Sequence, residues 1–124
     1  MISILVDTNI LIDHLRGREE ATDFLLSLKE QPFISSLTIA ELFAGVKGKK
    51  EKTALHQLIN AFHVIPISNE IAEEGGLFKN KYHKSHKIGL ADALIAGTVT
   101  LGKLQLATLN KKHFPMLNSV LVPY

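Results

Sequence analysis

The chain alternates short apolar runs with longer amphipathic segments, and this alternation constrains its fold more than any other feature. The first run, Ile2 to Val6, has the length and composition of a buried strand and ends at Asp7. Residues 8–16 then carry apolar side chains at helical spacing. A strand followed by a helix, repeated along a chain, is typical of an α/β protein with a mainly parallel central sheet.

Further segments continue this pattern to the end of the 124 residues. We expect strands at residues 2–6, 33–35, 64–67, 104–107 and 120–122. We expect helices at residues 8–16, 21–28, 36–46, 51–62, 69–82 and 90–100, a loop at 85–89, and Gly102 at the end of the last helix. Because the sequence shows no repeat, low-complexity segment or linker, we expect residues 1–124 to form a single α/β sandwich domain.

The composition argues against several classes of protein. The chain has no cysteine, which excludes disulfides and cysteine-based zinc sites and is typical of a reducing compartment. The first residues do not have the basic and apolar segments of a signal peptide, and no run approaches the roughly 20 apolar residues of a membrane helix. We therefore expect a cytoplasmic protein.

Positive charge is clustered along the chain, although the formal net charge is only +2. Three groups are present: Lys47, Lys49, Lys50 and Lys52; Lys79, Lys81, Lys84 and Lys87, with His83 and His86 among them; and Lys111, Lys112 and His113. Each group fits either an ordinary solvated surface or a set of contacts to phosphate groups. The acidic residues elsewhere in the chain help to decide between a solvated surface and phosphate contacts.

Two acidic residues follow or interrupt apolar segments in a way that folding alone explains poorly. Asp7 comes directly after the first strand, and ligands of open α/β sheets bind beyond the carboxyl ends of the strands, where the strand order reverses. Asp7 can equally cap the next helix. Glu41 lies inside the apolar segment SLTIAELFAG, where its side chain can face either solvent or a site.

A third acidic residue, Asp92, lies in the most apolar helix that we expect. A desolvated carboxylate is costly unless it is paired or binds a cation, and the alternative is a role at the helix start near Gly89. The chain's two arginines, Arg16 and Arg18, lie in the turn after the first helix and are not placed to neutralise this set. A hard cation, Mg²⁺ or Mn²⁺, fits three carboxylates better.

The segment ATLNKKHF adds polar groups after the penultimate strand. Its Thr108 and Asn110 are expected at the same edge of the sheet as Asp7, where either can hold a water or a phosphate oxygen. Ordinary turn chemistry is the alternative for both residues.

Four segments together resemble the motifs of PIN-domain nucleases, specifically the VapC-type toxins of toxin–antitoxin pairs. They are VDTNILID, with Asp7 and Asn9; TIAELFAG, with Glu41; LADALIAGTV, with Asp92; and LATLNKKHF, with Thr108 and Asn110. The resemblance covers essentially the whole chain. It implies a three-layer α/β/α sandwich with a mainly parallel central sheet, and it places the family's acidic residues on Asp7, Glu41 and Asp92.

One position departs from the family pattern. The aspartate that usually precedes the phenylalanine of the last motif is replaced by His113, before Phe114. The site therefore resembles a three-carboxylate site. His113 can act as a metal ligand, as a phosphate contact, or as a residue that simply faces solvent.

The resemblance implies an endoribonuclease that depends on Mg²⁺ or Mn²⁺ and leaves a 5′-phosphate and a 3′-hydroxyl. The cation would sit between Asp7 and Asp92, with Glu41 contributing directly or through water. The RNA backbone would be held by Lys47, Lys49, Lys50, Lys84, Lys87, Lys111 and Lys112. The resemblance also implies a homodimer and a cognate VapB-like antitoxin.

Two apolar faces are either partner surfaces or parts of the core: Phe24, Leu25 and Leu28, and Leu55, Leu58 and Ile59. Three other functions compete with the nuclease. A receiver domain would need paired acidic residues after the first strand, and a dehalogenase-type phosphatase would need an aspartate where Asn9 stands. A PIN fold without catalysis, acting as an RNA-binding or interaction protein, is the strongest competitor, and His113 is its main support.

Overall fold

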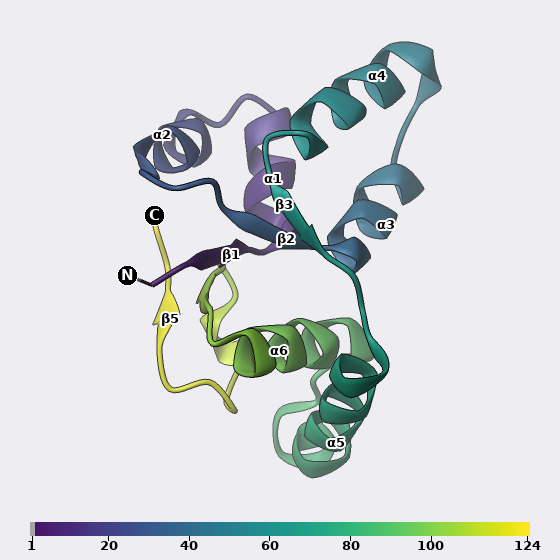
Figure 1. The fold of residues 1–124 in the computed structure, drawn as a ribbon, viewed down its shortest axis with the longest axis vertical. Helices are drawn as coiled ribbons and strands as arrows, with labels where there is room; N and C mark the ends of the chain where they lie inside the picture. Colours follow the sequence, from purple (N-terminus) through teal and green to yellow (C-terminus); the bar gives the residue numbers. More distant parts are fainter. Residues whose placement is uncertain (1) are drawn as a thin grey trace.

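A computed structural model describes residues 2–124, in which one sheet of five parallel strands has the order β3-β2-β1-β4-β5. The strands are β1 (Ile4–Val6), β2 (Phe33–Ser35), β3 (His63–Ile65), β4 (Gln105–Ala107) and β5 (Val120–Leu121). Figure 1 shows α1 to α4 on one side of this sheet and α5 and α6 on the other. The expected three-layer α/β/α architecture is therefore confirmed.

The helices fall where the apolar periodicity predicts them. They are α1 (Thr8–Leu15), α2 (Glu19–Ser27), α3 (Ser36–Ala44), α4 (Gly48–Ile59), α5 (Asn69–His86) and α6 (Leu90–Gly102), with a 3₁₀ turn, η1, at Lys111–His113. Most ends differ from the prediction by one to three residues. None of these helices is both long enough and apolar enough to cross a bilayer.

Two predicted helix ends are wrong for the same physical reason. Helix α5 continues through part of the predicted loop to His86, and α6 includes Gly102. Each helix ends at a lysine in the left-handed conformation, Lys87 with φ 51° and Lys103 with φ 54°. The amide of Lys87 donates to the His83 carbonyl, and the Lys79 ammonium donates to the Ile88 carbonyl at 2.6 Å. These bonds stabilise a conformation that glycine usually provides.

The core consists of two apolar clusters. One contains buried residues of α1, α3 and α4, such as Ile10, Leu42 and Leu55, with β1 and β2. The predicted faces of α2 and α4 pack against this cluster, which confirms that they belong to the core: Phe24, Leu25, Leu28, Leu58 and Ile59. The other cluster packs α6 against β1 and β4.

Glycines allow α5 and α6 to lie very close together. A Cβ on Gly75 would come within 3.0 Å of the Leu94 backbone, and a Cβ on Gly97 would come within 3.0 Å of the Gly75 nitrogen. Real Cβ atoms rarely make such contacts, so larger residues would push the helices apart. The sequence pattern does not reveal why α5 tolerates glycine in its interior; this contact does. It also fixes the position of α6, which carries Asp92.

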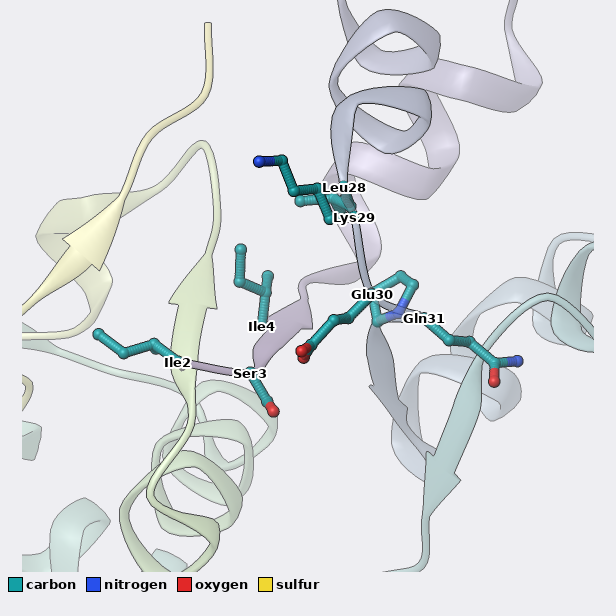
Figure 2. Close-up of a pocket in the computed structure, with 8 residues that line it drawn as sticks. Ile2, Ser3, Ile4, Leu28, Lys29, Glu30 and Gln31 are labelled. Carbon is teal, nitrogen blue, oxygen red and sulfur yellow. The ribbon is translucent and has the colours of Figure 1, made fainter.

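The two edges of the sheet differ in character. At the amino ends of the strands, a hollow of about 160 Å³ separates Ile2, Ser3 and Ile4 from residues 28–32. Figure 2 shows Ser3 and Glu30 pointing toward the gap while Gln31 points away. At the carboxyl ends, the strands β1, β2 and β4 deliver Asp7, Ser35 and Thr108 side by side.

Candidate active site

Asp7 lies where the strand order of the sheet reverses. Strands β2 and β3 follow on one side of β1, and β4 and β5 lie on the other side. Asp7 is 7% exposed, and its carboxylate accepts two hydrogen bonds, from the Thr8 amide at 2.8 Å and from the Thr108 hydroxyl at 2.7 Å. Asp7 is therefore both the predicted cap of α1 and a group at the predicted ligand edge of the sheet.

Glu41 reaches the same edge from α3. Its Oε1 accepts a hydrogen bond from the Thr8 hydroxyl at 2.7 Å, and that hydroxyl lies 2.9 Å from the hydroxyl of the fully buried Thr38. Because Thr8 gives its one proton to Glu41, Thr38 can donate to Thr8. The Glu41 side chain is exposed as a whole, yet its carboxylate is oriented toward the site by this pair of hydroxyls.

Asp92 enters from the first turn of α6 and pairs with His113. The His113 Nδ1 lies 3.2 Å from Asp92 Oδ2, and the two side chains are 42% and 30% exposed. No lysine or arginine among residues 2–124 forms an ion pair with Asp7, Glu41 or Asp92. The imidazole is therefore the basic group that the described chain places against this set.

The two aspartates resist ionisation. Burial is the largest cause that raises the Asp7 pKa, and the charges of Asp92 and Glu41 raise it further, against hydrogen bonds from Thr108 and Thr8. Burial also raises the Asp92 pKa, with a contribution from Glu41, while His113 lowers it. Glu41 contributes to the shifts of both aspartates, and Asp92 contributes to that of Asp7, so the three carboxylates share one electrostatic environment.

Polar side chains around Asp7 are arranged by Thr108. The buried Thr108 hydroxyl donates to Asp7 and accepts from the Asn9 side-chain amide at 3.3 Å and from the Asn110 backbone amide at 3.1 Å. The Asn9 Oδ1 is buried without a hydrogen-bond partner in the described chain. Such an atom is costly unless a water or a ligand satisfies it. The exposed Asn110 contributes its backbone amide to this arrangement rather than its side chain.

The chemistry of these donors suits a hard divalent cation. Carboxylate, amide and water oxygens are the ligands such ions prefer, and a cation would offset the burial and the smaller acid–acid repulsion that raise both aspartate pKa values. Within residues 2–124, no three acidic, histidine or cysteine side chains are grouped closely enough to hold one ion together. A cation with one or two direct carboxylates and several waters fits this arrangement, because Mg²⁺ commonly keeps part of its water shell.

Four of the predicted lysines lie close in the chain to residues of this site. Lys84 and Lys87 end α5, one short turn before α6 and Asp92, while Lys111 and Lys112 belong to η1 beside His113. All four are exposed. The remaining group, Lys47, Lys49 and Lys50, is exposed at the start of α4.

A groove of about 440 Å³ runs from Glu41 between α1, α3 and α4. Its wall is mainly apolar, with charged groups at intervals: Ile12, Leu15, Arg16, Glu41, Leu42, Gly45, Val46, Lys47, Glu51, Ala54 and Leu55. The groove is therefore continuous with the acidic site through Glu41.

Sequence reasoning missed the hydroxyls that orient the acids. Thr8 and Thr38 carry the hydrogen bonds at Glu41, and both are buried. Thr8 directly follows Asp7, and Thr38 lies one helical turn before Glu41, so their spacing contained a signal. The pairing of His113 with Asp92 had no such signal, because α6 and β4 separate the two residues.

Comparisons with known proteins agree with this architecture. The PIN domain family model matches residues 4–116. The chain is 43% identical to Ribonuclease VapC10 of Mycobacterium tuberculosis, over 98% of the chain and 92% of that relative, and 37% identical to Ribonuclease VapC19 of the same organism, over 97% and 98%. A toxin–antitoxin complex from Klebsiella pneumoniae contains a chain with a TM-score of 0.86 and 36% identity, with 98% of both chains covered. The chain therefore belongs to the PIN domain family, in the group of its VapC relatives.

Proposed function

We propose that this chain is an endoribonuclease that hydrolyses RNA phosphodiester bonds with the help of Mg²⁺ or Mn²⁺, and that it is the toxin of a toxin–antitoxin pair. The observation that carries the proposal is the shared environment of Asp7, Glu41 and Asp92, three acids with no lysine or arginine partner in the described chain. The similarity to VapC ribonucleases supports RNA as the substrate. The similarity to a chain of the Klebsiella pneumoniae toxin–antitoxin complex supports the role of a toxin.

Asp7 and Asp92 would hold the cation, with Glu41 acting directly or through water. A divalent cation in such a site lowers the pKa of a bound water and neutralises charge on the scissile phosphate. Each of the two Asp7 carboxylate oxygens accepts one hydrogen bond. These bonds hold the carboxylate in place and leave further lone pairs for the cation. No rearrangement of this acid is then needed during the reaction.

Glu41 is suited to orient the attacking water. Its Oε1 is engaged by Thr8, which leaves Oε2 to accept a proton from that water. The water oxygen would attack phosphorus in line, the bond from phosphorus to the 3′ oxygen would break, and that oxygen would take up a proton. The products are a 5′-phosphate and a 3′-hydroxyl. The buried Asn9 Oδ1 can accept a hydrogen bond from the same water.

The lysines would hold the RNA near acids that otherwise repel it. Lys84 and Lys87 lie before Asp92 in the chain, and Lys111 and Lys112 lie beside His113. Contacts from these side chains and from Lys47, Lys49 and Lys50 would be sensitive to salt, because binding releases the counterions of the RNA. The affinity for RNA is expected to fall as salt rises, and filter binding at several salt concentrations measures this.

An antitoxin segment would occupy the groove beside Glu41. The apolar wall of the groove suits the apolar face of a VapB-like peptide, and its end at Glu41 places such a peptide next to the acids. A homodimer is proposed as well, supported by large apolar side chains that are exposed on α5 and α6: Leu77 (56%), Leu90 (55%) and Leu101 (46%).

Removal of divalent cations tests the activity. EDTA should stop cleavage of RNA by the purified protein, and Mg²⁺ or Mn²⁺ in excess should restore it. Fragment 5′ ends, identified by sequencing, should carry phosphate. Cleavage that persists in EDTA would favour a metal-free mechanism through His113. No cleavage with any cation, despite binding of RNA, would favour a noncatalytic PIN protein.

A further inference from the structure

The buried hydroxyl of Thr38 is not explained by the local needs of α3. Thr38 precedes Glu41 by the spacing of a capping box, in which a threonine caps the start of a helix. The cap of α3 is instead Ser35, whose hydroxyl accepts from the Leu37 amide at 3.0 Å. The Thr38 hydroxyl lies 2.9 Å from the hydroxyl of Thr8, which belongs to α1. It therefore serves a contact between two helices rather than the start of one.

Another buried threonine, Thr98, shows what such a hydroxyl does when its role is local. Thr98 is 1% exposed in α6, and its hydroxyl donates to the Leu94 carbonyl one turn earlier, at 2.8 Å. This bond satisfies the hydroxyl within its own helix. Thr38 lies in the first turn of α3, and the residue four positions before it, Ile34, belongs to β2. The Thr38 hydroxyl is bonded to a side chain, that of Thr8.

The two hydroxyls and Glu41 form a series of hydrogen bonds with one direction. The Glu41 carboxylate can only accept, and the Thr8 hydroxyl, 2.7 Å from its Oε1, has a single proton to give. The bond between Thr8 and Thr38 must then use the proton of Thr38, so Thr38 donates to Thr8. If the Thr8 hydroxyl turned away from Glu41 and donated to Thr38, the Thr38 proton would lose its partner in a fully buried place. Such a loss is costly.

We propose that Thr38 is a positioning residue for RNA hydrolysis and acts on Glu41 through Thr8. This inference rests on the proposed function, because Glu41 is the acid proposed to orient the attacking water. The bond from Thr8 holds Oε1 and leaves Oε2 for that water, and Thr38 keeps the Thr8 hydroxyl in this orientation. Small errors in the position of a reacting group cost large factors in rate.

The burial of Thr38 predicts which kinetic constant it affects. Thr38 is 0% exposed, so neither RNA nor a cation can reach its hydroxyl. Its loss should lower kcat and leave the KM for RNA unchanged, because binding of RNA does not depend on the orientation of Glu41.

Thr38→Val replaces the hydroxyl by a methyl group of similar size. We expect kcat for RNA cleavage to fall by about 10-fold or more. Thr38→Ser keeps the hydroxyl and should keep most of the wild-type kcat. Thr98→Val is the matched control, because it makes the same change at an equally buried position on another helix, and it should leave kcat close to the wild-type value. Equal values of kcat in Thr38→Val and Thr98→Val would overturn the proposal.

A double-mutant cycle tests whether Thr38 acts through Thr8. Thr38→Val should lower kcat when Thr8 is present and should cause no further fall when it is added to Thr8→Val. A role in packing alone would lower kcat by the same factor in both backgrounds. That result would contradict the proposed series of hydrogen bonds.

Neutron diffraction from crystals of the wild type in D₂O tests the direction of the series without any variant. We expect one deuteron on Thr38 Oγ1 that points to Thr8 and another on Thr8 Oγ1 that points to Glu41. A Thr8 deuteron that points to Thr38 instead would overturn the proposal, even if Thr38→Val does not fold.

The two proposals can fail separately. If the wild type cleaves RNA and Thr38→Val cleaves it with the wild-type kcat, this inference fails while the proposed function stands. If the wild type does not cleave RNA with Mg²⁺ or Mn²⁺, both proposals fail.

Discussion

Helix α1 carries an aspartate near each end, and the two have opposite surroundings. Asp13 lies 3.5 Å from the Arg18 guanidinium and accepts a hydrogen bond from the Tyr124 hydroxyl at 2.9 Å. Arg18 also lies over the Tyr124 ring, 4.8 Å from its centroid. Asp7, at the other end, has Asp92 and Glu41 as its charged neighbours. One aspartate meets a cation from its own chain, and the other meets further anions.

The difference indicates that Asp13 has a structural role and that Asp7 belongs to a ligand-binding site. The cluster of Asp13, Arg18 and Tyr124 fastens the end of the chain to α1 and is complete without any other molecule. At the carboxyl edge of the sheet, burial and, to a smaller extent, the neighbouring acids raise the pKa of Asp7 and Asp92. Buried carboxylates that the chain itself leaves unneutralised are typical of functional sites.

The largest expected effect is a loss of RNA cleavage when an acid of the candidate site is replaced. Asp7→Asn and Asp92→Asn should lower RNA cleavage by about 100-fold or more, because each removes a charge from the cation site. Asparagine keeps the size of Asp7 and is a good helix cap, so α1 should persist. Circular dichroism should confirm the fold, and a cleavage assay measures the loss.

Asp13→Asn is the matched control for these variants. It makes the same chemical change on the same helix, away from the acids, and should leave cleavage within about twofold of the wild type. If Asp7→Asn cleaves RNA as fast as Asp13→Asn does, Asp7 has no part in the site.

A smaller effect is expected on the stability of the protein without divalent cations. Because the folded pKa of Asp7 is raised above its ordinary 3.8, its contribution to stability is present below that value and is lost as the pH rises through the raised pKa. Without divalent cations, Asp7→Asn should therefore become more stable than the wild type as the pH rises from about 4 to neutrality. Urea unfolding across this range measures the difference.

Mg²⁺ should reverse the order by stabilising the wild type alone, since only the native carboxylates bind the cation well. A wild type that stays more stable than Asp7→Asn at neutral pH without divalent cations would contradict a pKa of Asp7 that burial and the neighbouring acids raise.

The smallest effect concerns the structural cluster. Burial and the hydrogen bond to Asp13 raise the pKa of Tyr124 to about 12, so the phenol donates throughout the neutral range. Tyr124→Phe removes that donor but keeps the ring under Arg18, and it should cost about 1 kcal/mol of unfolding free energy. Cleavage should not change. Tyr82→Phe, on α5, is the control, and an equal loss of stability there would remove any special role for Tyr124.

Local sequence patterns predicted the fold well because the elements are short and regularly spaced. Strand β2 was predicted to the residue, and Asp7 was predicted at the end of β1 as either a cap or a site residue, of which the cap is confirmed. The prediction failed at the ends of α5 and α6, where a lysine takes the left-handed conformation instead of a glycine. Lys79 supports one of these ends from outside the local pattern.

The sequence predicted which residues form the candidate site but not the contacts among them. The strand ends and apolar flanks singled out Asp7, Glu41 and Asp92. Sheet order decides which of them meet, and this order depends on packing between distant segments rather than on local sequence. The hydrogen bond from Thr8 to Glu41 and the approach of His113 to Asp92 arise only at that level.

Crystals of the wild type soaked in Mn²⁺, with data collected to show its anomalous scattering, test the shared cation site most directly. We predict a manganese peak at the carboxyl edge of the sheet, within bonding distance of Asp92 and facing Asp7, and no comparable peak beside Asp13. An edge without manganese at saturating concentration, or a peak only elsewhere on the molecule, would contradict a cation held by these acids.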